Sequence, residues 1–301
     1  MVTLPPGLRI STEVVRSDSG TVLPVTRIDP HPNPKRVFLV AMGYAASLDP
    51  FEIQRFGLIA HRLRARLLIP ETPGCSYHAR TRLTMHERLS IFRSDFHPTA
   101  ERMLRAALSL DSARNDSRSY GVLGYSMGAS IASAMADSIH NDRTDQMSLS
   151  SVILVEPVAN QRWGALNILR SIRAEDRLID HYLKHNDAIE GAVNPSDRID
   201  GAPQARERQL DMLLLANALR AGRLINDLHS AAQQSYTLVV AHGRDSTMSR
   251  MDAAARLLQE CRDFGITAID LEVDGRHGLW QSLPAVDDLT VRIADAIGVR
   301  A

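Results

Sequence analysis

The chain of 301 residues is 44% hydrophobic and 23% charged, a composition typical of a folded globular protein with one large domain. Its 35 basic residues balance its 35 acidic ones, so the overall charge gives no indication of a nucleic-acid-binding surface. The two cysteines, Cys75 and Cys261, lie far apart and in no metal-ligand spacing, which argues against a disulfide framework and a cysteine metal site.

The first half of the sequence predicts strands that alternate with helices. Two runs rich in β-branched residues, joined by the turn sequence SDSG, predict a β-hairpin over 8–30. The later strands are short apolar runs without alternation, as expected for strands buried on both faces of a parallel sheet: VFLVAMGY, ARLLIP, SYGVLGY and SSVILVEPV. Helices are expected over 51–65, 98–111 and 128–140. This order predicts an α/β protein with an open, mostly parallel sheet covered by helices on both faces.

The alternation stops at about residue 162. From 162 to 234 the sequence shows helical stretches but no convincing strand, and RERQLDMLLLANALRAGRLI is the most apolar of them. Strands resume with SYTLVVAHG and TAIDLEV, each followed by a helix. We therefore expect one α/β core built from 1–161 and 235–301, with 162–234 as a helical insertion.

The segment GYSMG, Gly124 to Gly128, holds a serine between an apolar strand and a helix of small residues. In such a turn the two glycines keep side chains away from the crossing strand and helix, and the serine hydroxyl stands above the sheet edge. The adjacent helix N-terminus favours negative charge that develops there. We therefore predict that Ser126 is a nucleophile.

A serine nucleophile needs a histidine base and a carboxylate that orients the base. The acid is expected in a loop after a later strand, and the histidine after the last strand. We predict Asp245, in the HGRD segment, as the acid and His277, in the GRHG turn, as the base. Asp274 is the alternative acid, although it lies very close to His277 along the chain.

An oxyanion formed during attack needs hydrogen-bond donors. The backbone N–H of Met127, directly after the nucleophile, is one predicted donor. The second is expected from the loop after the strand VFLVA, where the N–H of Tyr44 is our first choice and that of Gly43 the alternative.

These motifs, in the order MGY, IPETPG, GYSMG, HGRD and GRHG, resemble those of the α/β-hydrolase fold superfamily, in its serine-nucleophile branch. The resemblance implies that 162–234 is a cap inserted after the sixth strand, and it gives Ser126, Asp245 and His277 the roles of nucleophile, acid and base. One departure is Met42 before Gly43, where the superfamily often has histidine.

The resemblance implies a serine hydrolase that cleaves an ester or thioester through an acyl-enzyme, without a metal or organic cofactor. An acyltransferase with the same residues, or a ligand-binding protein with an idle serine, would leave the same sequence pattern. The expected partner is a small acyl substrate, with Tyr77 and Trp163 as candidate substrate contacts. The apolar residues Leu210, Leu213, Leu214 and Leu219 either line an acyl channel or pack the cap on the core. No signal peptide and no apolar run of the roughly 20 residues needed for a membrane span is visible, so we expect a cytoplasmic protein.

Overall fold

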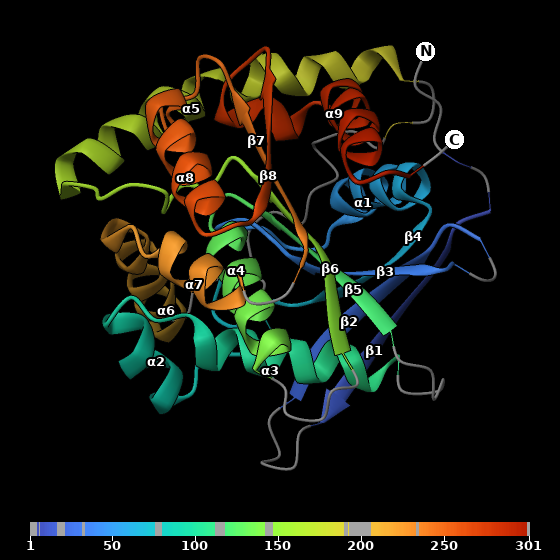
Figure 1. Ribbon diagram of the computed structural model, residues 1–301, viewed down its shortest axis with the longest axis horizontal. Coiled ribbons are helices and arrows are strands. Elements are labelled where there is room, and N and C mark those ends of the chain that lie inside the picture. Colours follow the sequence, from blue (N-terminus) through green and yellow to red (C-terminus); the bar gives the residue numbers. More distant parts are fainter. Residues whose placement is uncertain are drawn as a thin grey trace.

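A computed structural model describes residues 5, 7–16, 22–31, 34–75, 80–111, 118–141, 147–189, 192, 206–232 and 235–299. Its centre is one eight-stranded sheet in the order β1-β2-β4-β3-β5-β6-β7-β8 (Figure 1). The strands are β1 Arg9–Arg16, β2 Val22–Asp29, β3 Arg36–Ala41, β4 Ala65–Pro70, β5 Arg118–Tyr125, β6 Met147–Val155, β7 Thr237–Gly243 and β8 Thr267–Val273.

The strand pairing matches the predicted mostly parallel sheet. β1 and β2 form the predicted antiparallel hairpin, and β2 also pairs antiparallel with β4. The other five neighbouring pairs are parallel. Because parallel strands all end at the same edge, the loops after β3, β5, β6, β7 and β8 lie together at the carboxyl edge of the sheet.

Helices cover both faces of the sheet. The longer helices among the described residues are α1 Pro50–Leu63, α2 Met85–Phe92, α3 His97–Ser109, α4 Gly128–His140, α5 Ala165–Lys184, α6 Arg206–Ala218, α7 Leu224–Ala231, α8 Met251–Asp263 and α9 Leu283–Ala296. Short 3-10 helices are η1 His185–Ala188, η3 Leu219–Ala221 and η4 His277–Gln281.

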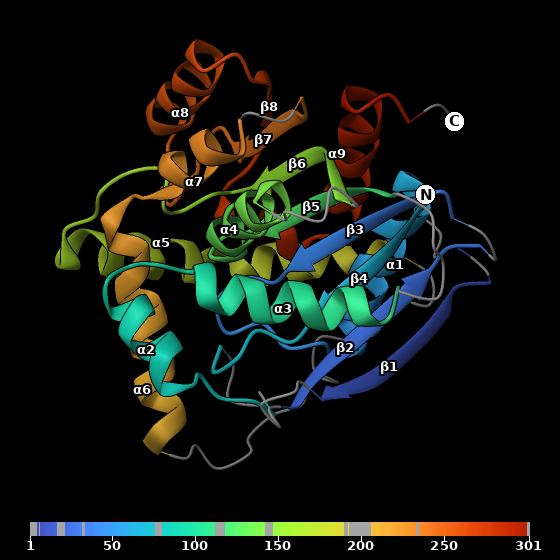
Figure 2. The same ribbon diagram turned by 60° about the horizontal axis from the view of Figure 1, so that its bottom comes forward.

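Alternate residues of the buried strands face two separate apolar clusters. In β3, Leu39 packs with the cluster under α3, α4, α7 and α8, whereas Phe38 and Val40 pack with the cluster under α1 and α9. Figure 1 shows α1 and α9 together on one side, and Figure 2 shows α3 lying across the other. The continuous apolar runs of the sequence therefore reflect burial on both faces.

Every described secondary-structure element between β6 and β7 is a helix. α5 contacts η4 beside the last strand, and α6 contacts α2. α7 packs closely against α4 and places Leu224 and Leu228 in the larger core cluster. Of the apolar residues singled out in α6 and η3, Leu210 and Leu213 are exposed, whereas Leu219 is buried in that core.

One ion cluster ties the helices of this face together. His97, at the start of α3, contacts Asp95 through Nδ1 at 2.7 Å and Asp137 of α4 through Nε2 at 2.8 Å, and Asp227 of α7 lies 3.9 Å from Nε2. The hydrogen bond to Asp137, with the other two carboxylates, raises the pKa of His97 to about 9. Burial raises the pKa of Asp227 to about 6.

We predict that this cluster makes stability depend on pH. A histidine whose folded pKa lies above its unfolded value of about 6.5 stabilises the fold fully below that value, and the contribution disappears as pH rises through about 9. Because His97 is partly exposed, we expect a modest effect. The free energy of unfolding of wild type should exceed that of His97→Gln by about 1 kcal/mol at pH 6.5, and this difference should vanish by about pH 10. Urea unfolding of both proteins across this range measures it. A difference that stays constant with pH would contradict the assigned charge state.

Candidate active site

Ser126 occupies a strained turn between β5 and α4. Its φ of 56° is left-handed, and its N–H donates to Val155 O at 2.9 Å. A Cβ on Gly124 would lie 2.2 Å from Gly128 O, and a Cβ on Gly128 would lie 2.1 Å from Ala41 O. Both glycines therefore allow the backbones of β3, β5 and α4 to touch, which is the turn geometry predicted from GYSMG.

His277 begins η4, just after β8, and its ring lies between two side chains. Its Nε2 is 3.0 Å from Ser126 Oγ, and its Nδ1 is 2.9 Å from Glu156 Oε2. A carboxylate only accepts hydrogen bonds, so Nδ1–H donates to Glu156 and leaves Nε2 of the neutral ring free to accept the Ser126 hydroxyl proton. The structure thus brings Ser126 and His277 together as predicted.

Glu156, rather than Asp245, is the carboxylate against His277. Asp245 is exposed in the loop after β7, where its backbone N–H donates to Gly275 O at 3.0 Å. The alternative, Asp274, has an 85% exposed side chain paired with Arg244. The structure therefore places a carboxylate from the end of β6, and not the predicted one from the loop after β7, against His277.

The Glu156 side chain is fully buried and accepts hydrogen bonds from three donors. Its Oε1 accepts the Gly243 N–H, and its Oε2 accepts the Ser246 hydroxyl at 2.6 Å as well as His277 Nδ1–H. Its own N–H donates to Ala241 O, and its φ is 52°. The segment 243–246, which was predicted to supply the acid, donates hydrogen bonds to the Glu156 carboxylate through Gly243 and Ser246.

A signal for Glu156 was present in the sequence. SVILVEPV places one carboxylate directly after a run of apolar residues on a strand buried on both faces. A carboxylate there is costly to bury unless it is hydrogen-bonded, and such a group is therefore a candidate for a specific role.

Two tyrosines hold the segment that carries His277. Tyr125 stacks with the rings of His277 and Trp280, with centroid distances of 5.3 Å and 4.6 Å, and its hydroxyl donates to His277 O at 3.0 Å. Tyr182 of α5 accepts the Arg276 N–H at 2.8 Å. A Cβ on Gly278 would lie 2.9 Å from the Tyr182 ring, so helix and turn are in close contact.

The predicted oxyanion residues also gather at this edge. β3 pairs with β5 so that Ala41 faces Gly124, which places the loop of Gly43 and Tyr44 beside the turn that holds Ser126 and Met127. A Cβ on Gly43 would lie 2.8 Å from the Tyr125 ring.

Cys75 supports this loop. Its Sγ–H donates to Gly43 O at 3.3 Å, and its carbonyl accepts the Ala45 N–H at 3.2 Å. Burial raises the pKa of the Cys75 thiol to about 12, so the thiol stays protonated and remains a donor.

The two predicted substrate contacts have different outcomes. Tyr77 lies outside the described residues. Trp163 is only 9% exposed, packs in the larger core cluster and donates its Nε1–H to Val158 O at 2.8 Å. Its remaining surface lines a cavity between α5 and α8.

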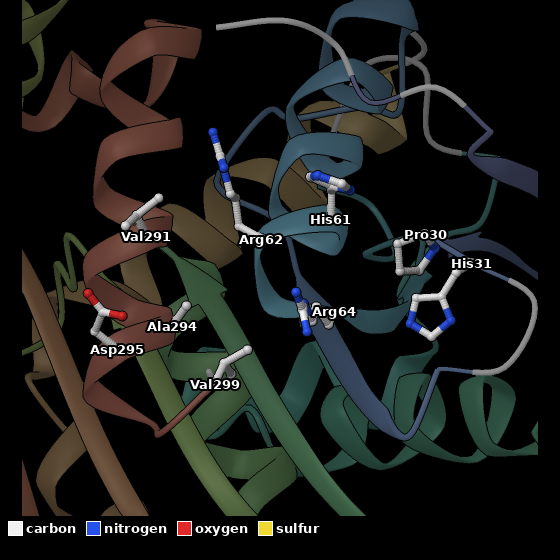
Figure 3. A pocket seen from close by; sticks show the side chains of 9 residues that line it. All are labelled: Pro30, His31, His61, Arg62, Arg64, Val291, Ala294, Asp295 and Val299. Carbon is white, nitrogen blue, oxygen red and sulfur yellow. The ribbon is translucent and has the colours of Figure 1, made fainter. Parts of the chain in front are cut away.

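A different cavity, of about 440 Å³, is lined by neither Ser126 nor His277 (Figure 3). Arg64, just before β4, and Val299, after α9, line it, so it opens at the amino edge of the parallel strands. Arg62, at its side, is held by both oxygens of Asp287. In the part of the chain that the structure describes, no group of three or more His, Cys, Asp or Glu could hold a metal, and no helix is long and apolar enough to cross a membrane.

Solved structures share this architecture over nearly the whole chain. A thioesterase domain from the curacin biosynthetic pathway matches with a TM-score of 0.56 and 16% identity, over 96% of this chain and 99% of that one. Rhizomucor miehei esterase matches with a TM-score of 0.61 and 12% identity, over 98% and 83% of the two chains. A Pyrococcus furiosus esterase matches with a TM-score of 0.57 and 10% identity, over 97% of this chain and 90% of that one. This protein has the α/β-hydrolase fold. No protein-family model and no curated protein matches the sequence.

In this α/β-hydrolase fold, the glycine beside the serine turn offers a direct test of the backbone contact. We predict that Gly128→Ala destabilises the protein by about 3 kcal/mol, because the new Cβ meets backbone atoms of Ala41 and Met42 that cannot move aside. Gly164→Ala is the control, since its Cβ would meet only the Asn167 side chain at 3.6 Å, and we expect a change below about 1 kcal/mol. Equal midpoints of urea unfolding for the two variants would contradict the close approach of α4 and β3.

Proposed function

We propose that this protein is a serine hydrolase that cleaves an ester or thioester through an acyl-enzyme. The observation that carries the proposal is the His277 ring, with Nε2 at 3.0 Å from Ser126 Oγ and Nδ1 at 2.9 Å from Glu156 Oε2. A nucleophile, a base and an orienting carboxylate in this sequence of contacts are the requirements for activating a serine. Esterases and thioesterases among the solved structures of similar fold support the same class.

In the proposed reaction His277 Nε2 takes the Ser126 proton while Oγ attacks the substrate carbonyl carbon. The N–H groups of Met127 and of Tyr44 or Gly43 stabilise the oxyanion. His277 then gives its proton to the departing alcohol or thiol, which leaves Ser126 acylated. Water attacks the acyl-enzyme with proton transfer to His277, and the acid is released as the proton returns to Ser126 Oγ.

Glu156 contributes in this scheme by fixing the histidine tautomer and by stabilising the imidazolium that forms on proton transfer. Its burial makes this interaction strong, because water does not screen it. The donors Gly243 and Ser246 hold the carboxylate in place, pointing at Nδ1.

Tyr125 and Tyr182 are positioning residues in the same scheme. The first bonds to the His277 carbonyl and the second to the Arg276 N–H, so the ring is held from opposite ends of its backbone segment. Tyr182 belongs to α5, which lies in the proposed cap of 162–234 inserted in a core of 1–161 and 235–301. The cap would then help to assemble the site as well as cover it.

The nucleophile is tested with a fluorophosphonate probe. We expect one adduct on Ser126, located by mass spectrometry, and none in Ser126→Ala. Ser130→Ala, a buried serine one turn further along α4, should label like wild type and serves as the control. A folded wild-type protein that takes no label would favour the binding-protein alternative.

The acid is tested by a pair of matched amide substitutions. We predict that Glu156→Gln lowers kcat for a short acyl ester by at least about 100-fold with little change in KM, because the histidine loses the carboxylate that orients it. Asp245→Asn should stay within about twofold, since that carboxylate is exposed. If instead Asp245→Asn shows the large loss and Glu156→Gln does not, Glu156 is not the acid.

A further inference from the structure

A cavity beside the proposed site is lined by three arginines. It has a volume of about 470 Å³ and lies between the amino ends of α5 and α8. Arg162, Arg170 and Arg250 line it together with neutral polar residues that include Asn167, Ser171 and Thr247.

The charged side chains that line this cavity are all positive. None of its lining residues is Asp or Glu. Arg250 pairs with Asp252 at 2.9 Å, but no ion pair recorded among the described residues involves Arg162 or Arg170. The carboxylate of Glu175, which is not part of the lining, is buried and accepts the Thr247 N–H and hydroxyl at 2.8 and 2.6 Å. Two guanidinium groups are therefore available to an incoming anion.

Of the two helices that border the cavity, α5 adds to its positive electrostatic potential. α5 is preceded by Gly164 and α8 by Arg250, and neither residue makes a side-chain capping hydrogen bond. The positive end of the α5 dipole therefore remains without a capping side chain or an acidic residue, whereas Asp252 in the first turn of α8 offsets the dipole of that helix. Hydroxyl and amide donors of the lining supply further hydrogen bonds to oxygen atoms.

The cavity is connected to the proposed active site through Ser246, but it does not include Ser126. Ser246 lines the cavity, and its hydroxyl donates to Glu156 Oε2, which contacts His277. Neither Ser126 nor His277 is part of the lining. A group bound here would belong to a part of the ligand remote from the reacting carbonyl, or to a separate anion.

We propose that this arginine-lined cavity binds a phosphate group. Guanidinium groups match phosphate oxygens through paired hydrogen bonds, and several of them around one cavity favour a doubly charged anion over a single carboxylate. Resting on the proposed function, the phosphate belongs to the leaving group of an acyl thioester, and this names the substrate class. The alternative source is free phosphate bound beside the acid-holding segment.

Binding is tested first, without catalysis. Calorimetry of inorganic phosphate at low ionic strength should show one site in wild type and in Ser126→Ala. We expect at least a tenfold weaker affinity in the double variant Arg162→Gln/Arg170→Gln. Arg173→Gln, an exposed arginine of α5 outside the lining, is the control and should bind like wild type. Absence of binding to wild type, or equal affinity in all variants, would overturn the proposal, whatever the activity of Ser126.

The source of the phosphate is tested with two thioesters of the same acyl group. Butyryl-coenzyme A carries phosphate, and the butyryl thioester of N-acetylcysteamine does not. The double variant should raise KM for the first by at least tenfold and leave kcat/KM for the second within about twofold. If phosphate binds as expected but the two thioesters are affected equally, the substrate assignment is overturned and the free anion is the ligand. Ser126→Ala should lose hydrolysis of both thioesters, and this loss tests the proposed function rather than the phosphate site in this cavity.

Discussion

The buried carboxylate of Glu156 is the constraint on which the site depends. A charge with no exposed surface is stable only when donors surround it, and here the donors come from separate parts of the chain. Gly243 and Ser246 lie in and after β7, and His277 follows β8. The carboxylate therefore couples the ends of three strands, and a shift of any one of them would leave a buried charge without a partner.

The second constraint is the close packing of backbones around Ser126. Gly124 and Gly128 bring β3, β5 and α4 into contact, and the strain of the left-handed serine is held by this packing. The parallel pairing of β3 with β5 then places the loop of Gly43 and Tyr44 next to the nucleophile turn. Local strain, strand register and the gathering of functional groups at one edge are thus consequences of the same arrangement.

Most of the fold and two members of the candidate site could be predicted from sequence. The apolar strands were confirmed because burial on both faces leaves a strong local signal in composition, whereas the hairpin, whose strand β1 is exposed, was predicted from its β-branched runs and turn residues. Ser126 and His277, which lie in contact, could be singled out because glycine-flanked turns after strands are also local signals. Asp245 was chosen because the loop after β7 reaches the sheet edge, but the end of β6 reaches the same edge, and spacing along the chain does not distinguish the two.

The sequence by itself determined the parallel sheet, its helices and the turn that holds the serine, since each follows from residue types within a short window. Only the tertiary structure decided which carboxylate meets His277, because that choice depends on the distance between strand ends and on which carboxylate is shielded from water. The same holds for the contact of Tyr182 with the histidine segment and for the three arginines around one cavity. These groups come from segments far apart in the chain, and their proximity results from the packing of α5 and α8 at the carboxyl edge of the sheet.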